Sequence, residues 1–307
     1  MELIRGLNGL TDRRRGCVVT IGAFDGIHLG HQALLAAVAA HGARLGRGKM
    51  VLTFEPTPRE YLAGPACPAR LTTFRERWQV LERLGVDVLW VLHFAEPLRQ
   101  LSGESFTGLL AHTLRAPAVV IGHDFRFGRN GEATADTLRA AAARLGFVTE
   151  VIEPVRLEGE RVSSSAVRAA LAGGDFERAR RLLGRPYSMI GRVVRGEQLG
   201  RQLGFPTANL RLQRRRSPLA GIFAVRVHGL GAVARAAVAS LGRRPTVGGG
   251  ELLLEVHVFD FSGDLYGRRI EVEFVAKLRA EERFEDVSAL VRQMHQDAQQ
   301  ARAILKV

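Results

Sequence analysis

The chain has 307 residues, of which 46% are hydrophobic, and this length suggests two domains that each bury a core. No stretch has the composition of a transmembrane helix or a signal peptide, and two cysteines exclude a disulfide framework or a thiolate metal site, so we expect a cytoplasmic protein without a membrane partner. The net charge of +13 comes mostly from arginines that are spread along the chain, so we expect no specific nucleic-acid partner.

Apolar runs alternate with helical patterns through the first 185 residues. The runs predict buried parallel strands at Cys17–Ile21, Met50–Phe54, Val86–Leu92, Ala118–Ile121 and Phe147–Ile152. Between them, helical spacing predicts helices at Gly30–Leu45, Thr73–Leu84, Ser102–Leu114 and Thr134–Leu145. Thr73 and Glu76 fit a capping box, and Gly46, Gly85 and Gly146 fit helix ends. These elements predict a doubly wound α/β domain, which binds ligands beyond the carboxyl ends of its strands.

The segment from Gly22 to His31 follows the first of these strands and begins a helix. Backbone N–H groups in the first turn of a helix have no intrahelical partner and favour anions such as phosphate. Glycines at Gly22, Gly26 and Gly30 allow a phosphate to approach the backbone, and His28 and His31, one helical turn apart, supply donors. The alternative is a histidine pair that caps the helix or binds a stray metal ion.

Two later segments reach the same edge of the predicted sheet. Residues 122–131 form a loop in which Phe125 and Phe127 offer aromatic surface and Asp124 and Asn130 offer hydrogen bonds to a planar ligand. The alternative is a plain connection whose phenylalanines fill the core.

In residues 161–168, three serines at a helix start are flanked by Arg161 and Arg168. Serines can simply cap a helix, but the two arginines are not needed for capping and suit a phosphate.

The pattern changes near Pro186, and from there runs of alternating apolar and polar residues predict a second, mainly β domain over residues 186–307. The predicted strands are Tyr187–Val194, Gly221–His228, Leu252–Phe261 and Arg269–Ala276, which suggest a small antiparallel barrel. A long helix ends the chain, and its expected apolar face consists of Val287, Leu290, Val291, Met294, Ala298 and Ala301.

Within this second domain, residues 191–210 contain glycines at 191, 196, 200 and 204 that predict a cover for phosphates. Thr207 and Asn209 project to the same side of an extended chain and offer uncharged oxygens to Mg²⁺. Glu255 interrupts an apolar strand and is either a solvent-facing charge or a general base for an alcohol. The alternative for the glycines is an ordinary hairpin.

Several motifs, in this order, resemble the bacterial bifunctional riboflavin kinase/FAD synthetase family over nearly the whole chain. The N-terminal motifs are GAFDGIHLGH, TFEPTPRE, GHDFRFG and RVSSSAVR. The C-terminal motifs are LGFPTANL, LGRRPTV, LEVHVFDFSGDLYG and KLRAEERF. The resemblance implies a nucleotidylyltransferase domain over residues 1–185, followed by a riboflavin kinase domain built on a six-stranded barrel.

The resemblance also implies two reactions, with ATP and riboflavin as substrates and FMN and FAD as products. In the first, the riboflavin 5′-hydroxyl attacks the γ-phosphate of ATP, with Glu255 as base and Mg²⁺ on Thr207 and Asn209. In the second, an FMN phosphate oxygen attacks the α-phosphate of another ATP and releases pyrophosphate. The residues implied in this second step around the triphosphate are His28, His31, Arg161, Ser164, Ser165 and Arg168.

Further residues are implied in binding ATP or flavin at the two sites. In the first domain these are Gly22, Phe24, Asp25, Gly30, Asp124, Phe125 and Phe127. In the second domain they are Gly191, Gly200, Gly204, Pro206 and Arg279.

The chain departs from the family pattern at three positions. The family usually has His at Thr57, Thr at Ser165 and Asn at Ser240. Ser165 keeps the hydroxyl, Ser240 affects a secondary contact of the kinase, and Thr57 removes an imidazole near the expected phosphates. We nevertheless expect both activities to persist, because the two histidines, the metal-binding pair and Glu255 are all present.

Two alternatives remain open at this point. One is a monofunctional enzyme in which one domain only binds or folds, and the other is a flavin- or RNA-binding protein without catalysis. The densest basic cluster, Arg211 with Arg214 to Arg216, is expected to be a solvated loop and gives little support to RNA binding. We therefore expect small-molecule partners and at most a weak homo-oligomer.

Overall fold

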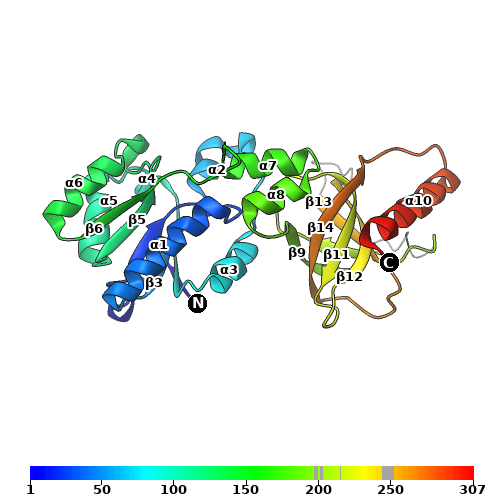
Figure 1. Cartoon of the computed structure of the whole chain (residues 1–307), viewed down its shortest axis with the longest axis horizontal. Helices are drawn as coiled ribbons and strands as arrows, with labels where there is room; N and C mark the ends of the chain where they lie inside the picture. Colours follow the sequence, from blue (N-terminus) through cyan, green and yellow to red (C-terminus); the bar gives the residue numbers. More distant parts are fainter. Residues whose placement is uncertain (197–199, 201–202, 215, 244–251) are drawn as a thin grey trace. The chain divides into compact units, whose positions relative to one another are not determined.

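The computed structural model describes residues 1–196, 200, 203–214, 216–243 and 252–307 (Figure 1). It contains two compact units. Unit 1 consists of Met1–Cys67 and Arg77–Ser163, and unit 2 consists of Pro68–Glu76 and Ser164–Val307. The domain boundary predicted at residues 185 and 186 lies within unit 2, and it stays a prediction.

Unit 1 contains a parallel sheet of six strands in the order β1-β4-β3-β2-β5-β6 (Figure 1). Five of them were predicted to within two residues, and in four of these, β2 to β5, the apolar runs are largely continuous and buried, whereas β6 is partly exposed. The edge strand β1 was not predicted, because only one of its four residues is buried. The strands are β1 (Glu2–Arg5), β2 (Val18–Ile21), β3 (Lys49–Phe54), β4 (Val88–Leu92), β5 (Ala118–Gly122) and β6 (Val148–Ile152).

The helices of unit 1 follow the predicted order with shorter additions. The main ones are α1 (Leu29–Leu45), α3 (Phe74–Arg83), which begins in unit 2, and α6 (Ala135–Leu145). The expected helix Ser102–Leu114 is divided into α5 (Gly103–Gly108) and a π-helical turn, η3 (Leu109–Thr113). The remaining elements are η1 (Asp12–Arg14), α2 (Pro58–Ala63), η2 (Gly64–Ala66), α4 (Glu96–Arg99), η4 (Arg129–Gly131), β7 (Arg156–Leu157) and β8 (Glu160–Arg161).

The predicted helix boundaries have the expected local chemistry. Thr73 N donates to Glu76 Oε2 at 2.6 Å and Glu76 N donates to Thr73 Oγ1 at 3.3 Å, which confirms the capping box. Gly46 and Gly146 end their helices in the left-handed conformation, at φ +61° and +80°.

Unit 2 contains a closed antiparallel barrel in the strand order β10-β13-β12-β11-β14-β9, as the resemblance implied. Alternate residues of each strand fill the interior, as in β13, where Leu254 and Val256 are buried and Glu255 faces the other way. The elements are α7 (Ser164–Ala172), α8 (Phe176–Leu183), β9 (Ser188–Val194), β10 (Ala208–Arg211), β11 (Gly221–His228), β12 (Arg235–Arg243), β13 (Leu252–Val258), β14 (Arg269–Arg279) and α10 (Val287–Leu305).

The C-terminal helix α10 packs on the outside of the barrel against β11, β12 and β14. Ala301 and Leu305 are buried there, and the expected positions Leu290, Val291, Met294 and Ala298 are partly buried. Val287 was wrongly placed on this face, since it is 61% exposed at the first turn of the helix.

Part of the basic cluster at residues 211–216 is buried, contrary to the expectation of a solvated loop. The Arg214 side chain is only 2% exposed and donates to Glu76 Oε2 at 2.5 Å. The other oxygen of Glu76 accepts from Ile190 N at 2.8 Å. A carboxylate buried in this way needs a paired cation, which explains why the Arg214 side chain is buried beside it. Residue 215 lies outside the described residues.

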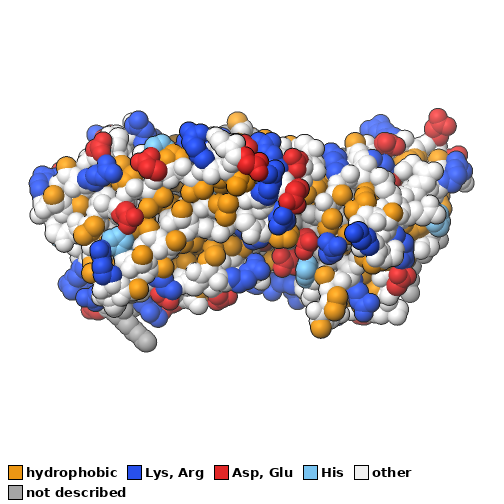
Figure 2. Space-filling view, in the orientation of Figure 1, with side chains coloured by type: hydrophobic (Ala, Val, Ile, Leu, Met, Phe, Trp, Pro, Cys, Tyr) orange, Lys and Arg blue, Asp and Glu red, His pale blue; other side chains and the backbone are white. Residues whose placement is uncertain are grey.

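On the face drawn in Figure 2, Lys and Arg side chains are interspersed with Asp and Glu over each unit. Such mixing does not favour a basic track for nucleic acid. Among the helices in the described part of the chain, none is long and apolar enough to cross a membrane.

Two candidate active sites

The first cavity, in unit 1, has a volume of about 380 Å³ and lies at the carboxyl ends of β2, β5 and β6. Strand β2 pairs with β3 on one side and with β5 on the other, so the order of the strands reverses at this point. Such a switch point is where open α/β sheets bind ligands. The cavity gathers many of the predicted residues, namely Gly22, Phe24, His28, Gly30, His31, Asp124, Phe125 and Arg161.

The loop between β2 and α1 has an unusual backbone. Phe24 and Ile27 have φ angles of +51° and +46°, and Gly26 has +85°. Positive φ is rare for residues with a side chain, above all for a β-branched one such as Ile27. The side chains of Phe24 and Ile27 are fully buried and hold the loop in this shape. Strain of this kind is typical of ligand-binding loops.

His28 and His31 lie together at the start of α1, as predicted. His28 is the N-cap residue, and its ring stacks on that of His31 with centroids 3.8 Å apart. Gly30 makes room for this arrangement, because a Cβ atom there would lie 3.1 Å from the His28 ring. The side chain of His28 does not cap the helix.

The alternative of a histidine metal site also finds no support in the described part of the chain. No group of three or more His, Cys, Asp or Glu side chains placed to hold a metal ion occurs among those residues.

Asp124 and Arg161 meet at the rim of the same cavity. Arg161 Nη2 donates to Asp124 Oδ2 at 2.5 Å. Burial raises the pKa of Asp124, but the hydrogen bond and charge of Arg161 and the nearby His123 outweigh it, so the pKa lies below its usual value. In this state, therefore, the carboxylate partly neutralises the Arg161 charge that was predicted to face phosphate.

The two phenylalanines of residues 122–131 have different environments. Phe125 lines the cavity, whereas Phe127 is buried in the core behind it, with ring centroids 5.5 Å apart. Phe127 also packs on Phe106, so it fills the core and supports Phe125. The structure thus fits the alternative of a core-filling side chain for Phe127, and the predicted contact of Phe127 with a ligand stays a prediction.

Besides Phe127, four predicted residues of this site are not among those that line the cavity. Ser164, Ser165 and Arg168 belong to unit 2, where they begin α7 and Arg168 Nε donates to Ala69 O at 2.7 Å. Asp25 lies in the strained loop. Their roles toward a nucleotide stay predictions.

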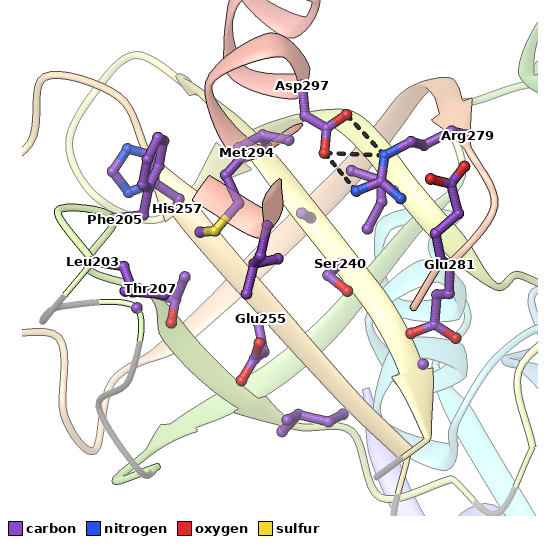
Figure 3. A pocket seen from close by; sticks show the side chains of 18 of the residues that line it. Leu203, Phe205, Thr207, Ser240, Glu255, His257, Arg279, Glu281, Met294 and Asp297 are labelled. Carbon is purple, nitrogen blue, oxygen red and sulfur yellow. Dashed lines mark hydrogen bonds and ion pairs between the residues drawn. The ribbon is translucent and has the colours of Figure 1, made fainter. Parts of the chain in front are cut away.

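The second cavity, in unit 2, has a volume of about 530 Å³ and lies on the outer face of the barrel (Figure 3). Figure 3 shows Thr207, Ser240 and Glu255 along the barrel wall and Met294 and Asp297 of α10 beside them. The apolar part of the lining comes from Leu203, Phe205, Ile222, Val238, Leu253, Phe284, Leu290 and Met294.

Three adjacent strands align polar side chains across this wall. Asn209 of β10 lies opposite Glu255 of β13, which in turn lies opposite Ser240 of β12. Side chains opposite each other in an antiparallel pair point to the same face, so all three point into the cavity. Glu255 is thus a half-buried residue of the cavity wall, and its role as a base stays a prediction.

Thr207 and Asn209 offer oxygen atoms beside Glu255. Asn209 is 6% exposed, and its buried Oδ1 has no hydrogen-bond partner among the described residues. Gly196 lies against this amide, because a Cβ atom there would come within 2.6 Å of it. Buried amide and hydroxyl oxygens of this kind fit a hard cation such as Mg²⁺.

The glycine-rich cover predicted over residues 191–210 is only partly tested. Residues 197–199 and 201–202 lie outside the described residues, as do residues 244–247 of the LGRRPTV motif. Gly200 lines the cavity.

Gly191, Gly204 and Pro206 were predicted as ligand-binding residues, and their surroundings indicate other uses. Gly191 is buried in β9, where a Cβ atom would lie 2.7 Å from Leu210, so it serves strand packing. Gly204 adopts φ +84° in a turn. Pro206 is exposed, and its carbonyl accepts from His257 Nδ1 at 2.9 Å. Close packing and turn geometry explain these residues without a ligand.

Arg279 lines the cavity but is held by a carboxylate of α10. Its Nε and Nη2 donate to Asp297 at 2.9 and 2.8 Å, and Asp297 is 4% exposed (Figure 3). This bidentate ion pair ties the end of β14 to α10. The structure therefore indicates that Arg279 supports the wall of the cavity, whereas it was predicted to bind a ligand.

Glu281 was not predicted and lies beside the same wall. Its carboxylate lies against Gly242, so a Cβ atom at that position would require the Glu281 side chain to move. Burial raises the pKa of Glu281 above its usual value, and Arg279 opposes this only in part. The motif KLRAEERF contains Glu281, but nothing in its spacing distinguishes this glutamate from its neighbours.

The comparisons with known proteins cover the whole chain. Residues 10–166 match the family model described as FAD synthetase, and residues 183–305 match the one described as riboflavin kinase. The chain is similar to the bifunctional riboflavin kinase/FMN adenylyltransferase of Pseudomonas fluorescens, with 45% identity over 99% of this chain and 98% of that protein. The protein of the same name from Haemophilus influenzae is 42% identical over 99% of each chain.

One solved structure is also similar over its full length. It is a Streptococcus pneumoniae protein described as a macrolide-efflux protein, with a TM-score of 0.84 and 30% identity over 98% of this chain and 99% of that one.

Proposed function

The chain belongs to the bifunctional riboflavin kinase/FMN adenylyltransferase family, and we propose that its two cavities carry out the two reactions, phosphoryl transfer in unit 2 and adenylyl transfer in unit 1. The single observation that carries this assignment is the row of Asn209, Glu255 and Ser240 across the barrel wall. It places one carboxylate beside an amide oxygen that lacks a hydrogen-bond partner among the described residues, as phosphoryl transfer to an alcohol requires.

In the kinase site, Glu255 accepts the proton of the riboflavin 5′-hydroxyl. The oxygen then forms a bond to the γ-phosphorus of ATP, the bond from that phosphorus to the bridging oxygen breaks, and ADP leaves with the electron pair. The apolar residues around Leu253, Leu290 and Met294 suit the flat ring system of a flavin.

Mg²⁺ fits this site, with the Thr207 hydroxyl and the Asn209 amide oxygen as its protein ligands. When bound, Mg²⁺ neutralises charge on the phosphates of ATP. Because Asn209 lies opposite Glu255, the residues that hold the metal and the base are fixed on neighbouring strands. This placement on paired strands helps to position the hydroxyl and the phosphate.

In the adenylyltransferase site, an oxygen of the FMN phosphate attacks the α-phosphorus of ATP, and pyrophosphate leaves. No protein nucleophile is needed. His28 and His31 at the start of α1 donate to the phosphates, together with Arg161. Phe125 offers aromatic surface to a ring of the nucleotide or flavin, and the buried Phe24 supports the loop at the cavity.

The products and substrates are small molecules, and we propose that the protein works in the cytoplasm. Any self-association is expected to be weak, since each reaction has its residues within one chain.

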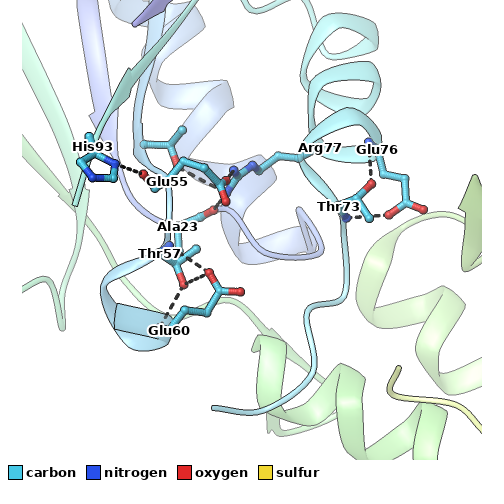
Figure 4. A network of polar contacts seen from close by, with 9 residues as sticks. Ala23, Glu55, Thr57, Glu60, Thr73, Glu76, Arg77 and His93 are labelled. Atoms are coloured by element: carbon cyan, nitrogen blue, oxygen red, sulfur yellow. Dashed lines mark hydrogen bonds and ion pairs between the residues drawn. The ribbon is translucent and has the colours of Figure 1, made fainter. Parts of the chain in front are cut away.

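Thr57, where the family usually has His, serves a local purpose (Figure 4). Its Oγ1 accepts from Glu60 N at 3.3 Å and its N donates to Glu60 Oε2 at 3.0 Å, a capping box for α2. The buried side chain is not among those that line the cavity of unit 1. The replacement of the imidazole therefore gives α2 a good N-cap.

We expect Thr57→His to leave FAD formation within about threefold and to lower the free energy of unfolding by about 1 kcal/mol through the lost cap. Thr57→Ser, which keeps the cap, is the control for stability. Rates of FAD formation from FMN and urea unfolding curves measure both effects. A large gain in FAD formation for Thr57→His would instead reveal a deficit in the natural sequence.

The proposed function is tested by incubating the protein with riboflavin, ATP and Mg²⁺ and separating the flavins by chromatography. We expect both FMN and FAD, and FAD alone when FMN is supplied. Omitting Mg²⁺ and adding a chelator should stop FMN formation. Products from only one starting flavin would restrict the proposal to one cavity, and no product from either would overturn it.

A further inference from the structure

Arg77 of α3 is a buried arginine whose side chain extends from the helix to Ala23 in the loop of the unit 1 cavity (Figure 4). Its side chain is 2% exposed. Nη1 donates to the carbonyl oxygen of Ala23 at 2.6 Å, and Nη2 donates to Glu55 Oε2 at 2.9 Å. Nη1 also lies 3.5 Å from Thr53 Oγ1. One guanidinium therefore connects the loop after β2 with the end of β3.

The contact at Ala23 acts on the part of the loop that is strained. The carbonyl of Ala23 belongs to the same planar peptide as the N–H of Phe24, where the chain turns to a positive φ. In a trans peptide these two groups point in opposite directions, so a carbonyl held by Arg77 fixes the direction of the Phe24 N–H. Gly22 and Phe24, on either side of Ala23, both line the cavity.

The charge of Arg77 is already neutralised within unit 1. Glu55 forms an ion pair with it, and the guanidinium is shielded from solvent. A buried and paired cation contributes little to attracting a triphosphate. The contribution of Arg77 to the site is to hold the backbone in place, because its planar guanidinium donates hydrogen bonds to two separate segments in fixed directions.

We propose that Arg77 is a positioning residue for adenylyl transfer, which sets the loop of residues 22–28 in the shape that receives the phosphates of ATP. This inference rests on the proposed function of unit 1. According to this inference, Arg77 does not line the cavity itself but orients the backbone that does.

The decisive substitution is Arg77→Lys, which keeps the charge but not the fork. A lysine has a single ammonium and does not reproduce both donor directions. We expect the KM for ATP in FAD formation to rise and kcat to fall, so that kcat/KM decreases by roughly 10²-fold. FMN formation from riboflavin by the same preparation should keep its kcat and KM, which shows that unit 2 is folded.

Two further variants separate positioning from general stability. Trp90→Phe removes another buried hydrogen bond of unit 1, from Trp90 Nε1 to Gly6 O at 2.8 Å, which is remote from the loop in sequence and contacts. It should lower the melting temperature without changing the KM for ATP. Glu55→Gln removes the ion pair but keeps an acceptor for Arg77, and it should stay close to the parent KM.

Each outcome decides the inference. A parent-like KM in Arg77→Lys overturns it, as does an equal rise of KM in Trp90→Phe. If Arg77→Lys does not fold, Arg77→Gln, which keeps one amide donor for Ala23, is judged by the same measurements. Failure of the parent protein to convert FMN to FAD would refute the proposed function itself. Normal FAD formation by the parent, with unchanged kcat and KM in the Arg77 variants, would refute only the positioning role.

Discussion

Replacing Glu255 by Gln is expected to lower FMN formation from riboflavin by roughly 10²- to 10⁴-fold, the range for loss of a general base. Gln has nearly the same shape, so the cross-strand pairs with Asn209 and Ser240 should remain. The amide does not accept a proton from the 5′-hydroxyl, and the loss should therefore fall on kcat. Steady-state rates of FMN formation at saturating riboflavin and ATP measure it.

The same variant should still convert supplied FMN to FAD, because that reaction is assigned to unit 1. Glu273→Gln is a matched control, since Glu273 lies on strand β14 of the same barrel, pairs with His228 at 2.8 Å and is not among the residues that line the cavity. It should leave FMN formation unchanged. If Glu255→Gln abolished both activities in a folded protein, the assignment of two separate sites would be wrong.

Most of the sheet of unit 1 could be predicted strand by strand because the central strands β2, β3, β4 and β5 are largely buried. Continuous apolar runs such as Met50–Phe54 leave few alternatives for a segment of that length. Edge strand β1 has no such signal. The end of the expected helix at Ser102–Leu114 becomes a π-helical turn, and the apolar spacing of four or five residues there does not separate the two helix types.

The barrel was less predictable from local patterns. Strand β12 is rich in alanine, which has a low preference for strands, and strand β10 has only four residues. Neither was predicted from periodicity, and the six-stranded barrel followed from the family resemblance. What forms β12 is pairing with β11 and β13, a tertiary effect that local composition does not record.

The candidate sites could be predicted where topology dictates them. His28, Asp124 and Arg161 follow different strands, and the carboxyl ends of parallel strands meet at one edge, so their convergence was expected. A motif does not tell whether a side chain faces the ligand or supports the wall. The ligand contacts predicted for Phe127, which is buried in the core, and for Arg279, which pairs with Asp297 at the cavity, therefore stay predictions. The role of Arg77 was not predicted, because the sequence of a helix rich in charged residues does not show which arginine is buried.

A second large effect is expected from His28→Ala, which removes one donor from the start of α1. Loss of a donor that stabilises charge in the transition state costs roughly 10²- to 10³-fold in kcat. We expect FAD formation from FMN to fall by this factor, while FMN formation from riboflavin is unchanged. His31 should keep its place beside Phe24, whose ring centroid is 4.9 Å away, so the remaining activity reports the second histidine.

The control for this prediction lies on the same helix. His41 is also buried in α1, but its ring bonds to Glu150 at 2.6 Å and to Arg44 at 2.8 Å and does not line the cavity. His41→Ala should therefore lower stability while leaving kcat and KM of the folded enzyme as in the parent. Equal losses of kcat in both variants would mean that His28 matters only for the integrity of α1. A loss confined to His28→Ala would place the imidazole at the phosphates, where the glycine at position 30 lets its ring lie across the first turn of the helix.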